Sequence, residues 1–182
     1  TNEIKEKYET VYVFDCGDPS RLGKYESIVK DSKNIIVVDH HIDPKFGTLQ
    51  FIDSEAASTT QVLYRELIKE GFDITTDMAN CLLTGLITDT GRFQYSNTTS
   101  EVFNIASALL DLGADISLIS ENIYGSIEFN ALRLQSEILN RISLNQKLNF
   151  AFSIIYQNDY KKYNVDPEET DFLIDTVRLV KE

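Results

Sequence analysis

Two short apolar runs stand out in the first forty residues of the chain. Residues 10–15 (TVYVFD) are mostly β-branched and aromatic, and residues 34–39 (NIIVVD) are apolar at four consecutive positions. A strand that is apolar on both faces is typical of the inside of a parallel sheet covered by helices. The segment between them, 24–32 (KYESIVKDS), predicts a helix. The order strand, helix, strand therefore indicates a βαβ unit.

A region of helical periodicity follows a third candidate strand at residues 48–53 (TLQFID). Ser54 fits the N-cap of the next helix, and Gly71 is placed to end it. Farther along, Thr98-x-x-Glu101 is a capping-box pattern that precedes another apolar run. The helices of this region are expected at residues 55–70, from 75 or 76 onward, from 98 to 113, at 115–124 and at 127–142.

The pattern changes after Asn145. Residues 148–156 (LNFAFSIIY) predict a strand, and Asp166-Pro167 predicts the start of a last helix. One strand and one helix are too little to bury a core of their own. We therefore expect an α/β fold with a parallel sheet flanked by helices over residues 1–125, its N-terminal part missing, a connector helix at 126–145, and the incomplete beginning of a second α/β domain at 146–182.

Composition and charge narrow the class of protein. The 42% hydrophobic and 25% charged residues are those of a globular chain, and no apolar run approaches the roughly 20 residues that span a bilayer. The formal net charge of −12 argues against binding long nucleic acids. Cys16 and Cys81 have no CxxC spacing, so no disulfide framework is expected. Without a signal segment, we expect a cytoplasmic protein with no membrane partner.

Acidic and histidine side chains follow the predicted strands. Asp15 ends the first strand, and the triplet Asp39-His40-His41, which holds both histidines of the chain, ends the second. Asp89 follows the apolar run CLLTGLIT, where a helix end or a turn can lead back to the same edge. Open parallel α/β sheets bind their ligands outside the carboxyl ends of the strands. We therefore expect these side chains to meet at one site.

This set of side chains suits a divalent metal. An imidazole with two carboxylates fits an ion of intermediate hardness, such as Mn²⁺, Fe²⁺ or Zn²⁺. Asp15, His40 and Asp89 are the candidate ligands, and His41 is left to contact a substrate. A carboxylate can also bridge two metals that activate water for attack on phosphorus. The alternative is structural: Asp15 as a turn former, the histidines as hydrogen-bonded loop residues and Asp89 as the cap of a turn.

Three nearby groups are candidate contacts for an anionic substrate. Arg21 and Arg92 offer bidentate guanidinium donors, although Arg21 can instead pair with an acid such as Asp18. Ser58 begins a run of three hydroxyl residues near the start of a predicted helix, where hydroxyl and N–H groups can meet an anion. A solvated first turn is the alternative for that run.

Three motifs in order carry a resemblance to a known family: "VFDCGDPSRLG", "VVDHH" and "GLITDTGRFQY". Over roughly residues 11–125 they resemble the DHH-family phosphoesterases, and among these the branch of bacterial nanoRNases and 3′-phosphoadenosine-5′-phosphate (pAp) phosphatases. The segment from about residue 148 resembles the opening of the family's C-terminal DHH-associated domain.

The resemblance implies a metal assignment for three residues. Proteins of this family hold two Mn²⁺ ions, which Mg²⁺, Co²⁺ or Fe²⁺ can replace, between the strand ends. Asp15 corresponds to the acid that bridges both metals. His40 and Asp89 correspond to further metal ligands. The assignment from the family therefore agrees with the one from residue chemistry.

The resemblance also implies an activity and its catalytic residues. His41 corresponds to the residue that contacts the scissile phosphate, Asp39 to an acid that supports the site, and Arg92 to a residue close to the substrate. The implied substrates are short oligoribonucleotides, dinucleotides, including the products of cyclic dinucleotides, or nucleoside 3′,5′-bisphosphates, and the implied assembly is a homodimer.

Two motifs of the family have no counterpart in these 182 residues. One is an N-terminal motif with a histidine followed by aspartates, and the other is a C-terminal glycine-rich motif with a histidine. We therefore expect the chain alone to supply ligands for one metal and only the bridging acid of the other, and to be weakly active or inactive. The alternatives are a manganese-dependent inorganic pyrophosphatase, which shares the DHH motif, and a non-catalytic nucleotide-sensing module.

Overall fold

The structure is a computed structural model, and it describes residues 7–41, 46–170 and 172–180. The chain divides into two compact units, Thr1–Ile119 and Ser120–Glu182. We describe each unit by itself. The domain boundaries expected from the sequence, at 125 and 145, stay a prediction. In the structure the division falls a few residues earlier, and the helix expected as a connector packs into the core of the second unit.

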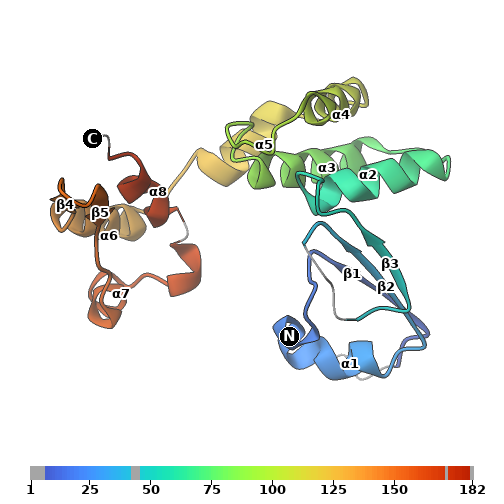
Figure 1. Ribbon diagram of the computed structural model, residues 1–182, viewed down its shortest axis with the longest axis horizontal. Helices are drawn as coiled ribbons and strands as arrows, with labels where there is room; N and C mark the ends of the chain where they lie inside the picture. Colours follow the sequence, from blue (N-terminus) through green and yellow to red (C-terminus); the bar gives the residue numbers. More distant parts are fainter. Residues whose placement is uncertain (1–6, 42–45, 171, 181–182) are drawn as a thin grey trace. The chain divides into compact units, whose positions relative to one another are not determined.

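A three-stranded parallel sheet lies in the middle of the first unit (Figure 1). Its strands are β1 (Thr10–Phe14), β2 (Asn34–Asp39) and β3 (Leu49–Ile52), in the order β1-β2-β3. The central position of β2 confirms the prediction from its apolar run. The connection from β1 to β2 contains the 3-10 segment η1 (Pro19–Tyr25) and the short helix α1 (Glu26–Lys30), so the predicted βαβ unit is present.

The core of the sheet lies on both of its faces. Val37 is fully buried with Val13 and Val29, on the face that α1 covers. The next residue of β2, Val38, is buried against Val62 of α2 on the other face. Successive side chains of a strand point to opposite faces, which explains why β2 is apolar without interruption.

Helices α2 (Thr59–Lys69), α3 (Thr76–Asp89), α4 (Ser100–Asp111) and α5 (Ile116–Tyr124) follow the sheet, and α2 to α4 lie on the side opposite to α1 (Figure 1). Leu83, Leu86, Val102 and Leu109 are almost fully buried in the helical layer. In the described part of the chain, no single helix is long and apolar enough to cross a membrane. The helices α4 and α5 pass that test only as a pair bent by 110°.

Two predicted helix starts were wrong. The N-cap of α2 is Ser58 rather than Ser54, because the Ser58 hydroxyl accepts the N–H of Gln61, while residues 54–57 form a turn and a bend before the helix. The N-cap of α4 is Thr99 rather than Thr98, and its hydroxyl accepts the N–H of Val102. The expected capping box fails because the partner that takes the Glu101 carboxylate is an arginine.

That arginine, Arg65, ties three elements of the first unit together. Its guanidinium donates two hydrogen bonds to Glu101 of α4, at 2.7 and 2.6 Å, and a further one to Asp53 after β3. The hydrogen bonds from Arg65 lower the pKa of the Glu101 carboxyl. The end of β3, the middle of α2 and the first turn of α4 are therefore held in one ion-pair network.

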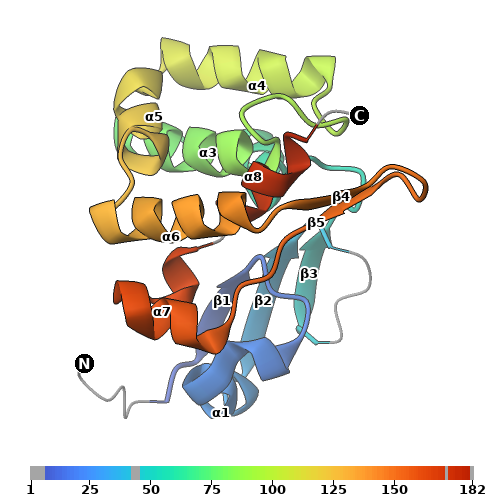
Figure 2. The same cartoon turned by 90° about the vertical axis from the view of Figure 1, so that its left-hand side faces the viewer.

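The second unit contains α6 (Phe129–Asn140), a two-stranded antiparallel sheet of β4 (Ser143–Asn145) and β5 (Phe150–Phe152), α7 (Gln157–Tyr163), η2 (Pro167–Glu169) and α8 (Leu173–Arg178) (Figure 2). The strand predicted at 148–156 is shorter than expected, since only residues 150–152 pair with β4. The predicted last helix is broken into η2 and α8.

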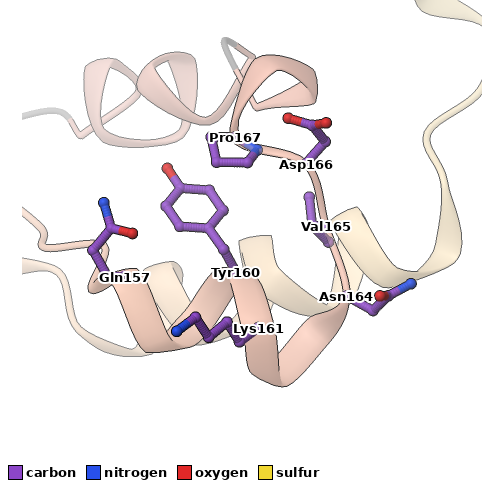
Figure 3. Close-up of a pocket in the computed structure, with 7 residues that line it drawn as sticks. All are labelled: Gln157, Tyr160, Lys161, Asn164, Val165, Asp166 and Pro167. Atoms are coloured by element: carbon purple, nitrogen blue, oxygen red, sulfur yellow. The ribbon is translucent and has the colours of Figure 1, made fainter.

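The core of the second unit gathers Ala131, Leu134 and Ile138 of α6 with Val165 and Leu173. Beside it, the turn after α7 opens a shallow pocket between α7 and Pro167 (Figure 3). Lys161 and Asp166 are the charged side chains among the seven that line this pocket.

An arginine also organises the second unit, and its partners make stability depend on pH. Arg141 donates to Asp159, whose side chain is buried, and at 2.9 Å to Glu137. Hydrogen bonds from Arg141 and from the N–H of Tyr156 lower the pKa of Asp159 to about 2. Because that pKa is depressed, the stabilisation is present above the ordinary carboxyl range and is lost as the pH falls towards 2.

We expect Arg141→Met to lower the melting temperature at pH 7, because it leaves the buried Asp159 carboxylate without its guanidinium partner. The difference from the parent should shrink as the pH falls towards 2, as thermal denaturation followed by circular dichroism would show. Arg178→Met is the matched control, since Arg178 pairs with Asp175 on the surface. A difference that is constant from pH 7 to pH 2 would contradict the role of this pair.

Candidate metal centre

The ends of two strands and one helix bring the predicted ligands together. Asp15 follows β1, His40 follows β2, and Asp89 is the last residue of α3. The His40 Nε2 atom lies 3.6 Å from Asp15 Oδ1 and 3.8 Å from Asp89 Oδ2. The predicted convergence of these three side chains is therefore present in the structure, with Asp89 at a helix end.

The His40 ring is oriented by a backbone carbonyl. Its Nδ1 atom lies 3.2 Å from the carbonyl oxygen of Ala56, which can only accept, so Nδ1 carries the proton of this hydrogen bond. In the neutral ring, Nε2 then presents its lone pair towards the oxygens of Asp15 and Asp89. Metal-binding histidines in proteins are held in the same way, through a hydrogen bond from the other ring nitrogen.

Asp39 is a buried anchor for the two histidines. Its side chain is fully buried, and Oδ1 accepts the backbone N–H groups of His40 and His41, at 2.7 and 3.0 Å, and the Nδ1–H of His41 at 2.7 Å. Burial alone would raise the pKa of the Asp39 carboxyl, but these hydrogen bonds outweigh it and lower the pKa. Asp39 therefore stays ionised and fixes the loop that follows β2.

His41 is held differently from His40. Its Nδ1 atom is used by Asp39 and also lies 3.6 Å from Asp15 Oδ1, while half of its side chain is exposed. Asp15, His40 and His41 form a cluster whose ligand atoms lie within 4.8 Å of one another. Within it, the Nδ1 atom of His41 is already hydrogen-bonded to Asp39. Because half of the His41 side chain is exposed, its ring can contact a group outside the protein.

Asp15 and Asp89 bring two negative charges to the same point. Burial, and then the neighbouring Asp15 carboxylate, raise the pKa of Asp89, while His40 lowers it in part. Two carboxylate oxygens and an imidazole lone pair that face one another repel unless a proton or a cation lies between them. The described cluster offers oxygen and nitrogen donors and no thiolate, which fits a divalent ion of intermediate hardness.

The other predicted contact residues lie in different surroundings. Arg92 follows α3 and is exposed, with a left-handed backbone at φ 62°. Arg21 lies in η1, is exposed, and donates its backbone N–H to the Asp18 carbonyl. Ser58 is fully buried, and its hydroxyl caps α2 and lies 2.9 Å from the Thr60 hydroxyl. The position of Ser58 is therefore that of a structural cap rather than an open anion contact.

Sequence reasoning missed two groups that hold the ligands. The Thr59 hydroxyl donates to Asp15 Oδ1 at 2.8 Å, and the Asn97 side-chain amide donates to the carbonyl oxygens of Ala57 and Asp89, at 3.2 and 3.1 Å. The run of hydroxyl residues at 58–60 was predicted to meet an anionic ligand, whereas the Thr59 hydroxyl bonds to the Asp15 carboxylate of the protein itself. For Asn97, no spacing rule connects it to either carbonyl.

The sequence of this chain is similar to a known protein family and to individual bacterial proteins. Residues 2–86 match the DHH family, N-terminal domain. The "Bifunctional oligoribonuclease and PAP phosphatase NrnA" of Thermus thermophilus is 33% identical over 115 residues, which are 63% of this chain and 34% of the relative. The "Probable bifunctional oligoribonuclease and PAP phosphatase NrnA" of Streptococcus mutans is 30% identical over 152 residues, 80% of this chain and 48% of the relative. The chain thus spans half or less of these two relatives.

Among solved structures, an exopolyphosphatase-related protein from Bacteroides fragilis is similar to this chain. The TM-score is 0.86 at 24% sequence identity, and the match covers 95% of this chain and 52% of that one. At this identity the similarity supports the fold, which is the α/β arrangement expected from the sequence.

We expect Asp39→Asn to destabilise the first unit by about 1–3 kcal/mol, because it replaces charge-assisted hydrogen bonds by neutral ones in a buried position. Urea denaturation of the two proteins at pH 7 measures the difference. Asp111→Asn, at the exposed end of α4, is the control and should change the stability by less than about 0.5 kcal/mol. Equal effects of the two substitutions would show that Asp39 is not an anchor.

Proposed function

We propose that this chain, whose residues 2–86 match the DHH family, N-terminal domain, belongs to that family and carries the metal-binding core of a phosphoesterase. The observation that carries the proposal is the meeting of Asp15, His40 and Asp89 at one point, with the His40 ring oriented by a carbonyl. The names of the relatives, oligoribonuclease and PAP phosphatase, support the same class of reaction.

The proposed metal is Mn²⁺, with Asp15, His40 and Asp89 as its ligands in this chain. A bound divalent ion would supply a polarised phosphate oxygen and an acidified water. The donor set supports this choice, since carboxylate oxygens with one imidazole suit Mn²⁺ better than a soft ion. Ordering of the ligands before binding also lowers the cost of assembling the site.

The side chains around the ligands would act on the substrate. Asp39 holds His41 by Nδ1, and Nε2 of this half-exposed side chain would donate to or accept from a phosphate oxygen. Arg92, exposed directly after the helix that ends in Asp89, would contribute a guanidinium to the charge that builds on phosphorus.

The proposed substrates are small: short oligoribonucleotides, dinucleotides or nucleoside 3′,5′-bisphosphates. The net charge of −12 supports a small anion over a long one. A long polyanion is repelled by the acidic surface along its whole length, whereas a small anion contacts only the metal site. We further propose that these 182 residues alone turn over such substrates weakly, since they offer ligands for one metal and the bridging acid of a second.

The metal assignment has a direct test. We expect His40→Ala to weaken Mn²⁺ binding by more than the roughly 10–100-fold that loss of an outer partner costs, because it removes a ligand. His41→Ala is the matched control, and it should keep Mn²⁺ affinity within about 10-fold. Isothermal titration calorimetry of the metal-free proteins measures both. Unchanged binding in His40→Ala would show that the cluster is structural.

The proposed activity is tested on this chain at high protein concentration. With Mn²⁺ and a dinucleotide, His41→Ala should lower kcat by roughly 10²-fold or more while Mn²⁺ affinity is kept, since loss of one donor to the reacting phosphate costs that much. Product formation is followed by chromatography. A His41→Ala protein as active as the parent would remove His41 from the reaction, and a parent that cleaves no phosphate ester would refute the proposed function.

A further inference from the structure

We propose that Thr59 is a positioning residue, whose hydroxyl aims the Asp15 carboxylate into the metal site. The proposal rests on the function proposed above, and it adds a residue that the sequence motifs did not point to. Its starting observation is the hydrogen bond of 2.8 Å from Thr59 Oγ1 to Asp15 Oδ1, which joins residues 44 positions apart.

Asp15 needs such a partner because the packing around it does not fix the orientation of its carboxylate. It follows β1 with a left-handed backbone, φ 57°, and its N–H donates to the Val38 carbonyl at 3.1 Å. These features turn the residue towards the end of β2. Its side chain is 54% exposed, so packing does not select one orientation of the carboxylate.

Thr59 is placed to supply that orientation because its own position is fixed. It is the first residue of α2, is 6% exposed, and follows the buried N-cap Ser58. The Gln61 side chain accepts the N–H of Ala57 at 2.7 Å, so the turn before the helix is also held from inside it. The Thr59 hydroxyl therefore has little conformational freedom, because it lies on a buried first turn that Ser58 and Gln61 both hold by hydrogen bonds. Its hydrogen bond restricts the orientation of the Asp15 carboxylate in turn.

The geometry also shows which part of the carboxylate is held. Asp15 Oδ1 accepts the hydroxyl of Thr59 and lies 3.6 Å from His40 Nε2 and 3.6 Å from His41 Nδ1. One lone pair of Oδ1 is used by the hydroxyl, which leaves the other and both of those on Oδ2 for a cation. A carboxylate that is tied at one oxygen in this way can hold a metal without a search among rotamers.

A structural role for the same hydrogen bond makes a different prediction. If Thr59 only joins the end of β1 to α2, its loss lowers stability and leaves metal affinity unchanged in the folded protein. If it positions Asp15, its loss weakens the metal affinity even where the protein remains folded. Mn²⁺ binding to the folded, metal-free chain therefore separates the two roles.

The decisive variant is Thr59→Val, which keeps the shape of the side chain and removes the hydroxyl. We expect its Kd for Mn²⁺, measured by isothermal titration calorimetry, to rise roughly 10-fold or more, as is typical for loss of a group that holds a ligand. Thr59→Ser keeps the hydroxyl and should bind Mn²⁺ within about threefold of the parent. Thr84→Val is the matched control, because the Thr84 hydroxyl bonds to its own helix at Asn80, and it should bind as the parent does.

Three results with the Thr59 variants would overturn the proposal. Parent-like Mn²⁺ affinity in folded Thr59→Val overturns the proposal, and so does a loss of affinity in Thr59→Ser equal to that in Thr59→Val. Failure of Thr59→Val to fold also overturns it, since the hydroxyl is then required by the fold. His40→Ala, measured beside them, separates the two claims: if it binds Mn²⁺ normally, the metal site itself is refuted, and if it alone loses binding, only the role of Thr59 is refuted.

Discussion

The site depends on a buried segment of four residues, 56–59, which runs from the turn after β3 into the first residue of α2. The Ala56 carbonyl orients His40, the Ala57 carbonyl shares Asn97 with the carbonyl of Asp89, and the Thr59 hydroxyl holds Asp15. All four residues of the segment are buried, at 0–6% exposure. Because this buried segment contacts His40 and Asp15 directly and is joined to Asp89 through Asn97, the relative positions of the three candidate ligands depend on a single local structure rather than on three independent loops.

The carboxylates of the site divide into two kinds by their hydrogen bonds. Asp39 is buried, and three N–H donors on its Oδ1 atom lower the pKa of its carboxyl. Asp15 and Asp89 receive little of this kind, and the pKa of Asp89 is raised by its burial and by the nearby Asp15. The fold therefore stabilises the negative charge of Asp39 by hydrogen bonds and leaves the charges of Asp15 and Asp89 to be balanced by a cation. This is the electrostatic arrangement that a metal site requires.

The sheet and the meeting of the ligands could be predicted because both follow from local rules. An apolar run such as residues 34–39 has to lie inside a parallel sheet, and polar residues at strand ends have to share an edge. Helix starts were less predictable. Ser54 and Ser58 are equally good N-caps by residue type, and the Glu101 carboxylate accepts hydrogen bonds from Arg65 of another helix instead of completing a capping box. The groups behind the ligands were not predictable, because contacts such as Thr59 to Asp15 depend on tertiary packing between distant residues.

The central claim is that Asp15, His40 and Asp89 hold a divalent metal together. Anomalous diffraction from crystals of the chain grown with Mn²⁺ tests it most directly. The account predicts a peak within roughly 2.0–2.2 Å of His40 Nε2 and of one oxygen each of Asp15 and Asp89. A peak bound elsewhere, or no peak at a saturating concentration of Mn²⁺ with these three side chains ordered, would contradict it.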